Sequence, residues 1–297
     1  MKNLILVAIA LLLASCGSES DKEMSLPQAL LEPLVPVSVH INGFTSSQED
    51  FPDTRATTQT PNAYDGIKAM TLAFYNGTTE VYKTTQLRDD PSNFTTFGDF
   101  ELSLPIGSYT MVVLGYGYYE GVELTLTSPT QAEYTGGTTR ETLAVTQTVN
   151  ITSTNAVELE ATLNRIVTQL KVISTDNRTD NVTNVRMTFS AGGKAFNPTT
   201  GLATSNTGIS STVGITTSVG ARSASIAYLF LASDEQEMDV TIETLDSEGA
   251  VLFSKTVNNV LFQRNRITKL TGPIYSAASA SSFVLNTDWL DSYNVNF

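Results

Sequence analysis

Apolar and polar side chains alternate with a period of two along most of this chain, and this pattern constrains the fold more than any other feature. In residues 35–42, for example, Val35, Val37, Val39 and Ile41 occupy every second position. Successive side chains of a β-strand point to opposite faces, so such a segment predicts a strand with one buried face. Helical periodicity is scarce, and the sequence therefore predicts an all-β protein.

Turn signals separate the predicted strands. Asn76-Gly77 follows the alternating segment 70–74, and both positions of such a turn accept a positive φ, so a hairpin with 81–83 as its return strand is expected. A second hairpin is predicted within residues 100–114, which turn at a Pro-Ile-Gly sequence. Short strands joined by turns at roughly 8–12-residue spacing are typical of β-sandwiches rather than of alternating strands and helices.

The second half of the chain carries the same pattern. Its predicted strands are residues 182–189, 209–219, 223–231, 239–245, 251–257 and 267–275, with a turn at Asp246-Ser247-Glu248-Gly249. Residues 129–154 are rich in Thr and Gly, and we expect long loops with one short strand there. The length fits two consecutive β-sandwich domains, residues 33–160 and 161–297.

The first residues form an export signal. Lys2 precedes an uninterrupted apolar run from Leu4 to Leu13, which is shorter than the roughly 20 residues needed to span a bilayer. Ala14-Ser15-Cys16 then matches a lipobox, so residues 1–15 are predicted to be removed and Cys16 to carry lipid. The alternative is an ordinary signal peptide followed by a buried cysteine. Residues 16–32 are predicted to form a flexible acidic linker.

Composition excludes several partners and sites. The net charge of −13 argues against nucleic acid, because phosphate binding is driven by Lys and Arg, and against a polybasic membrane patch. Cys16 is the single cysteine, so once it is acylated no disulfide, thiolate metal site or cysteine nucleophile remains. An exported, Thr-rich, acidic chain of low charge density is typical of extracellular β proteins.

The sequence predicts no catalytic residue, no metal site and no cofactor, and hence no enzyme. The single histidine, His40, is expected on the outward face of the first strand, which excludes a His-based triad or a site with several histidines. No glycine-rich loop opens a helix to hold phosphate. Carboxylate pairs such as Asp89-Asp90 and Asp234-Glu235 fall in predicted turns, so a glycosidase stays open only as a weak alternative.

Several motifs together resemble the fimbrillins, the type V pilus subunits of Bacteroidota. The motifs are the lipobox, Thr54-Arg55-Ala56, Leu104-Pro105-Ile106-Gly107-Ser108-Tyr109, Leu163-Asn164-Arg165-Ile166-Val167, residues 265–275 and residues 289–297. The resemblance implies two transthyretin-like sandwiches and a lipoprotein delivered to the outer membrane and exposed at the cell surface. It also implies a structural subunit of a fimbria that supports adhesion.

The resemblance further implies assembly by strand exchange. An arginine-specific protease would cut between Arg55 and Ala56 and release the first strand, residues 35–44. A strand from a neighbouring subunit would then fill the exposed groove by β-augmentation, giving a head-to-tail polymer. The donor would be residues 282–297, and the side chains expected to enter pockets are Phe283, Leu285, Trp289 and Val295.

Three other roles stay open at this point. An anchor subunit of the same family would keep its first strand and stay attached through Cys16 at the base of the pilus, and a tip subunit is a third position. A surface glycan-binding lipoprotein would usually present several aromatic platforms, whereas this chain has one tryptophan. Expected partners are therefore other fimbrial subunits, the outer membrane through lipid, and a receptor on a host or bacterial surface.

Overall fold

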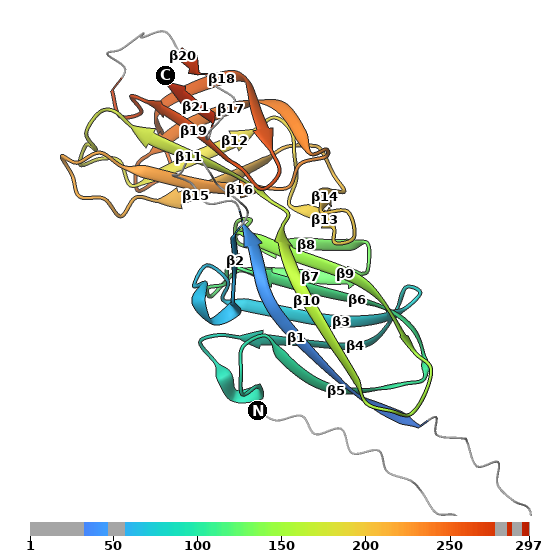
Figure 1. Ribbon diagram of the computed structural model, residues 1–297. Helices are drawn as coiled ribbons and strands as arrows, with labels where there is room; N and C mark the ends of the chain where they lie inside the picture. The colour runs from blue at the N-terminus through green and yellow to red at the C-terminus, as the bar shows by residue number, and fades with distance from the viewer. Residues whose placement is uncertain (1–32, 47–56, 277–283, 287–292, 297) are drawn as a thin grey trace, which may run out of the picture. The chain divides into compact units, whose positions relative to one another are not determined.

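The computed structural model describes residues 33–46, 57–276, 284–286 and 293–296 (Figure 1). These residues belong to one compact unit, Pro33–Phe297, and residues 1–32 lie outside the described part of the chain. The described residues form strands and two short 3-10 helices, η1 (Pro61–Ala63) and η2 (Pro91–Asn93), without an α-helix. The all-β prediction is confirmed.

The first sandwich is built from one long, folded-over sheet. Its strands are β1 (Leu34–Ser46), β2 (Thr57–Gln59), β3 (Ala69–Asn76), β4 (Thr79–Leu87), β5 (Asp99–Pro105), β6 (Gly107–Tyr116), β9 (Thr142–Ile151) and β10 (Val157–Arg165). Their order is β2-β1-β10-β9-β6-β3-β4, and β5 pairs with β1 on the same edge as β2, opposite β10. β10 pairs with β9 only through Asn164 and Arg165, so β5-β1-β10 and β9-β6-β3-β4 act as two facing layers.

The core of this sandwich forms where the two layers face each other. Alternate residues of β1 meet alternate residues of β3 and β6, among them Met70, Leu72, Met111 and Val113, and all four are fully buried. Period-two alternation in each strand is what brings these side chains to one side. The predicted buried face of the first strand is confirmed.

β3 and β6 are buried on their second face as well. This face is covered by β7 (Glu123–Ser128) and β8 (Gln131–Gly136), and by Phe196 and Phe230 from the second half of the chain. β13 (Ala195–Asn197) pairs with β8 and with β14 (Leu202–Ala203), which completes a four-stranded sheet. The rings of Phe196 and Phe230 stack with centroids 4.1 Å apart. Residues from the second half of the chain therefore form part of the core of the first sandwich.

The second sandwich consists of two further sheets around their own core. The strands are β11 (Thr168–Ser174), β12 (Asn184–Phe189), β15 (Ile209–Gly214), β16 (Ala224–Leu229), β17 (Glu235–Leu245), β18 (Val251–Gln263), β19 (Ile267–Gly272), β20 (Val284–Asn286) and β21 (Tyr293–Asn296). The sheet orders are β16-β11-β19-β21-β20 and β15-β12-β17-β18. Buried residues such as Leu170, Met187, Ile242 and Phe262 fill the core. The predicted fold class, two consecutive sandwiches, is confirmed.

The turns predicted at Asn76-Gly77 and at Asp246-Ser247-Glu248-Gly249 are present. Gly77 has a φ of 61° between β3 and β4, and Gly249 has a φ of 84° between β17 and β18. In the second turn the Asp246 carboxylate accepts hydrogen bonds from the backbone N–H groups of Glu248 and Ala250, at 2.9 and 2.8 Å. These turns form where predicted because the positive φ and the Asp side chain act locally.

The expectation of loops over residues 129–154 is wrong. This stretch contains β8 and the ten-residue strand β9, which pairs with β6 along its whole length. Leu143, Val149 and Ile151 are buried, and Thr142 is fully buried on the opposite face. Threonine is β-branched and fits a strand that neighbours cover, so high Thr content marked a central strand here rather than a loop.

The expected domain boundary between residues 160 and 161 falls inside β10. The pairing of β10 with β1 continues to Asn164, and the chain enters the second sandwich after Arg165, with β11 beginning at Thr168. The strand continues past residue 160 because Ala161 and Leu163 still belong to the first core. The division into two domains stays a prediction, since Pro33–Phe297 forms one compact unit.

The Pro105–Tyr109 motif closes the turn between β5 and β6. β5 pairs with β1, whereas β6 pairs with β3 and β9, so this turn joins the two layers and the hairpin predicted within residues 100–114 is wrong. The Tyr109 hydroxyl donates a hydrogen bond of 2.9 Å to the Pro105 carbonyl, much like the tyrosine corner of other sandwiches. A Cβ on Gly107 would lie 2.9 Å from the Tyr109 hydroxyl oxygen, so the ring can cross this position only above a glycine. The motif therefore has a local structural reason.

Replacing Tyr109 by Phe is expected to lower the free energy of unfolding by about 1–2 kcal/mol, because the Pro105 carbonyl loses its partner in a largely buried place. Urea unfolding of the variant measures this loss. Tyr118→Phe is the matched control, since Tyr118 is exposed, and it is expected to leave the unfolding midpoint unchanged. Equal midpoints for the two variants would contradict the role assigned to the hydroxyl.

Candidate functional site

The first strand, β1, lies between β5 and β10 and pairs with both (Figure 1). Residues 37–45 pair in parallel with residues 157–164 of β10, with a bulge between Ile41 and Gly43. Residues 34–40 pair antiparallel with residues 99–105 of β5. The strand that comes first in the sequence thus has a central position, with both edges hydrogen-bonded to strands that come much later. We call the space that it fills the β1 site.

The inward face of β1 is buried almost completely. Val35, Val37 and Val39 have no exposed surface, and Ile41 and Phe44 are 5% and 1% exposed. Burying one such side chain contributes roughly 1.5–3 kcal/mol. The apolar face is therefore the main attraction between β1 and the rest of the sandwich, and the backbone ladders set its register.

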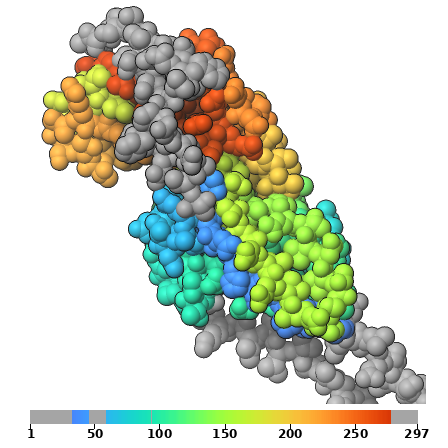
Figure 2. Space-filling model, in the orientation of Figure 1, coloured from blue at the N-terminus to red at the C-terminus, as the bar shows by residue number. Residues whose placement is uncertain are grey.

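The outward face of β1 is polar and contacts carboxylates on both neighbouring strands. The contacts are Ser38 Oγ to Glu101 Oε2 at 2.8 Å, His40 Nδ1 to Asp99 Oδ1 at 3.1 Å, and Asn42 Nδ2 to Glu160 Oε2 at 3.1 Å. Figure 2 shows blue atoms of this strand at the surface between teal and yellow-green segments. Because these contacts are exposed, each contributes little to stability, and they act mainly on register.

The contribution of His40 to the stability of the β1 pairing depends on pH. The hydrogen bond to Asp99 raises the pKa of His40 above its ordinary value of 6.5, burial opposes this shift, and the charges of Asp99, Glu101 and Glu158 raise the pKa further. A raised pKa in the folded state means that His40 stabilises the fold fully below pH 6.5, and that this contribution is lost as the pH rises through the raised value.

We expect an NMR titration of the His40 ring to give a midpoint above 6.5, and Asp99→Asn to move the midpoint down towards that value. Glu237→Gln, which removes a carboxylate from β17 in the second sandwich, is the matched control and should leave the midpoint in place. A midpoint at or below 6.5 in the unaltered chain would contradict the contact with Asp99.

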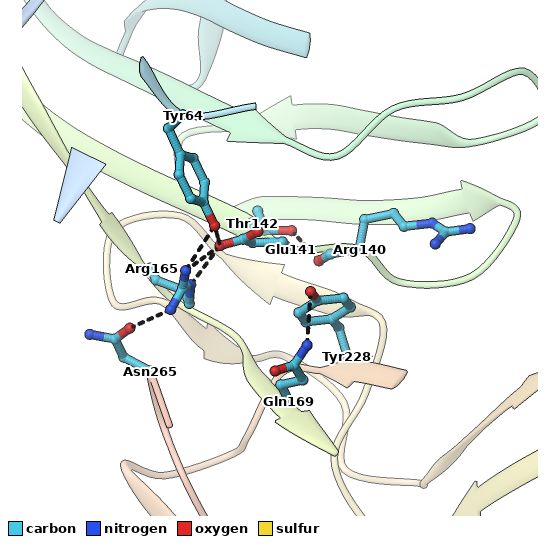
Figure 3. A network of polar contacts seen from close by, with 8 residues as sticks. All are labelled: Tyr64, Arg140, Glu141, Thr142, Arg165, Gln169, Tyr228 and Asn265. Carbon is cyan, nitrogen blue, oxygen red and sulfur yellow. Dashed lines mark hydrogen bonds and ion pairs between the residues drawn. The ribbon is translucent and has the colours of Figure 1, made fainter. Parts of the chain in front are cut away.

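A buried polar network lies at the end of β10 (Figure 3). Glu141 Oε1 accepts hydrogen bonds from the Tyr64 hydroxyl at 2.5 Å and from Arg165 Nε at 2.8 Å. Arg165 Nη2 also contacts this carboxylate, and it donates to the Tyr64 hydroxyl oxygen at 3.0 Å. The Arg165 and Glu141 side chains are 14% and 10% exposed, so this is a largely desolvated ion pair.

The network connects β1 with the turn before β19. The Phe44 ring of β1 packs edge-on against Tyr64, with centroids 6.0 Å apart. On the other side Arg165 Nη1 lies 3.5 Å from Asn265 Oδ1 (Figure 3). Burial and the adjacent Glu141 carboxylate raise the pKa of Tyr64, so this hydroxyl stays protonated and donates. The sequence motifs that contain Arg165 and Asn265 therefore lie close together. The reason is that the strands that follow these motifs, β11 and β19, pair in parallel.

Arg88 holds the segment between β2 and β3. Its guanidinium donates to the carbonyl oxygens of Pro61, Tyr64 and Ile67, at 2.6, 3.2 and 2.9 Å. It also lies over the Phe97 ring, 4.2 Å from the centroid. These contacts do not include β1, so residues 61–67 have an attachment to the sandwich that does not depend on the first strand. β2, in contrast, pairs with residues 44–46 of β1.

Most of the predicted site residues lie outside the described part of the chain: Cys16, Arg55, Ala56, Phe283 and Trp289. Leu285 is in β20 and Val295 is in β21, and the two are backbone partners. β21 also pairs in parallel with β19, where Val295 is opposite Leu270. The structure therefore brings two of the donor candidates together, at the edge of a sheet of their own chain.

Sequence reasoning missed the roles of Tyr64 and Glu141. Neither lies in a recognisable motif, although their partner Arg165 belongs to the Leu163–Val167 motif. Glu141 comes immediately before the buried strand β9. An acidic residue in such a place is only a weak sign of a buried ion pair until its neighbours in space are known.

No described helix is long and apolar enough to cross a membrane. Within the residues that the structure covers, no group of three or more His, Cys, Asp or Glu side chains is arranged to hold a metal ion.

Comparison with known protein families shows which family this chain matches. The model of a family of unknown function, DUF6562, matches residues 35–293, which is most of the chain and includes both sandwiches. The chain belongs to the DUF6562 family. The match begins at Val35, so the strand that fills the β1 site is part of the DUF6562 pattern.

No curated protein sequence matches this DUF6562 member. Solved structures that resemble it include a candidate adhesin from Bacteroides ovatus, with 11% identity, a TM-score of 0.49, and coverage of 76% of this chain and 83% of the other. The fimbrial anchor protein Mfa2 from Porphyromonas gingivalis has 12% identity, a TM-score of 0.42, and coverage of 75% and 82%. The fimbrilin FimA from the same species has 13% identity, a TM-score of 0.40, and coverage of 88% and 96%.

Proposed function

We propose that this chain is a structural subunit of a cell-surface fimbria. It reaches the outer membrane as a lipoprotein with lipid on Cys16, joins other fimbrial subunits by strand exchange, and supports adhesion to a host or bacterial surface without catalysis. The observation that carries the proposal is β1: the first strand of the sandwich has a fully apolar buried face and pairs along both edges, yet joins the next strand through residues 47–56.

The proposed cut between Arg55 and Ala56 falls within this connection, immediately before β2. After cleavage β1 would be held only by non-covalent contacts. When a strand that is paired on both edges departs, each neighbouring strand is left with an unpaired edge, and the apolar side chains that the strand covered are exposed. Such a surface is an association site by default. The segment after β2 keeps the contacts that Arg88 and Arg165 make with it when β1 departs.

The carboxy-terminal segment has the pattern that a replacement strand needs. The four donor candidates all have odd residue numbers, so a strand running through them would present them to one face: Phe283, Leu285, Trp289 and Val295. Backbone hydrogen bonds to β5 and β10 do not depend on sequence, while alternate side chains choose the register. Donation requires β21 to leave its short pairing with residues 268–271 of β19.

Amino-terminal sequencing of the protein recovered from the cell surface tests the proposal. A start at Ala56 is expected for a polymerising subunit, together with multimers that resist SDS. A blocked, lipidated Cys16 in a protein found at the base of fimbriae supports the alternative of an uncleaved anchor subunit. A lipidated chain that associates with no other subunit would overturn both.

A further inference from the structure

A hollow of about 390 Å³ lies beside β1. It is lined on one side by the paired strands β1 and β5 and on the other by β4. We call it the His40 hollow. Its lining includes His40 and Asp99 from the pair of strands, Tyr82 and Thr84 from β4, and Phe94 from the loop after η2. The volume is within the roughly 300–1,000 Å³ of small-molecule sites.

The hollow has a rigid wall. Gln86 is 3% exposed, and its amide donates to the Asp99 carbonyl at 2.6 Å and accepts from the Gly98 N–H at 2.8 Å. Phe94 packs against Phe97 with centroids 5.9 Å apart. These contacts fix β5 and the loop after η2 relative to β4, so the hollow exists before any ligand arrives and little ordering is needed on binding.

The lining combines partly buried rings with hydrogen-bond acceptors. Tyr82 and Phe94 pack on the core with part of their surface and also line the hollow. Asp99, Glu101 and the Thr84 hydroxyl supply polar groups around them. Apolar ring surface together with convergent polar groups is the composition of a ligand site, and carboxylates paired with rings suit a ligand with both C–H faces and hydroxyl donors.

Charge decides between ligand classes. Asp99 and Glu101 are acidic, and the chain as a whole carries a net charge of −13. His40 is the one basic side chain in the lining, and it is already paired with Asp99. An anionic sugar would meet repulsion, whereas an ammonium group would be attracted.

We propose that the His40 hollow binds a non-acidic sugar unit of a glycan, with amino sugars bound more tightly than neutral ones. The carboxylates accept hydrogen bonds from ring hydroxyl or ammonium groups, and Tyr82 and Phe94 contact the C–H face of the ring. Because His40 belongs to β1, the site as described exists in the chain that keeps its first strand. The proposal does not depend on polymerisation.

Isothermal titration of the intact chain with the methyl glycosides of glucose, galactose, mannose, glucosamine and glucuronic acid tests this inference. We expect glucosamine to bind more tightly than the neutral sugars, and glucuronic acid to bind most weakly. No binding by any of the five up to about 20 mM, or tighter binding of glucuronic acid, would overturn the proposal.

Two variants locate the binding. Glu101→Gln is expected to weaken glucosamine binding about tenfold, because a charge-assisted hydrogen bond is lost. Glu237→Gln, the same change on β17 in the second sandwich, is the control and should leave the affinity unchanged. Phe94→Leu is expected to weaken the neutral and amino sugars alike, with thermal unfolding used to show that the variant is folded. Equal effects of Glu101→Gln and Glu237→Gln would place the binding elsewhere and overturn the assignment.

Discussion

A chain that begins at Ala56 is expected to form head-to-tail multimers, whereas the intact chain stays monomeric. Loss of β1 uncovers the surface that the five inward side chains between Val35 and Phe44 had buried. At roughly 2 kcal/mol each, these side chains account for about 10 kcal/mol, which is comparable to the whole stability of a domain. The vacated β1 site must therefore be refilled, and the strand available at high concentration is the carboxy-terminal one of another copy.

Light scattering after size-exclusion chromatography, together with unheated SDS gels, measures this result. A synthetic peptide of residues 33–46 should return the shortened chain to monomers, because it carries the native register. The same peptide with Val37→Asp and Val39→Asp is the control and should not do so, since two charges would enter the core. A shortened chain that stays folded and monomeric without peptide would contradict strand exchange at the β1 site.

Breaking the buried ion pair is the second large effect that we expect. Arg165→Met should lower the free energy of unfolding by about 3–5 kcal/mol, because the Glu141 carboxylate loses its cationic partner in a place where it is 10% exposed. The Tyr64 hydroxyl alone does not compensate a full charge. The double variant Arg165→Met and Glu141→Leu should cost less than the single one, because no unpaired charge remains.

Urea unfolding of the three chains measures both differences. The matched control is the exposed pair of Lys194 and Glu133, which are 52% and 41% exposed and 3.4 Å apart. Lys194→Met is expected to cost less than about 1 kcal/mol, as is usual for surface pairs. If Arg165→Met costs no more than Lys194→Met, the network at the end of β10 is not the stabilising element described.

Strand positions were predictable where the signal was local. The alternation in residues 35–41 and the turns at Asn76-Gly77 and Gly249 each depend on a few neighbouring residues, and all three are confirmed. β9 was not predicted because its partner along the whole length is β6, and the paired residues are 26 to 44 positions apart in the chain. The pairing of β13 with β8 likewise joins segments more than sixty residues apart, which no local pattern indicates.

The features of the β1 site likewise separate into those that the sequence predicted and those that it did not. The sequence predicted an apolar first strand, and its outward His40 was expected at the surface. It did not predict that β10 would run parallel to β1, or that Asp99 and Glu101 would lie opposite His40 and Ser38. Register between distant strands results from many packing contacts at once, so single positions carry little of it.

Local sequence pattern is enough to show that this chain is built from strands, that its first strand has one apolar face, and where the tightest turns form. These properties follow from side-chain alternation and from backbone conformations that one or two residues impose. Three features become visible in the folded protein alone: β1 is paired on both edges, Arg165, Glu141 and Tyr64 meet at the end of β10, and a hollow opens beside His40. These features depend on contacts between residues far apart in the chain, and such contacts exist only after the sheets have packed.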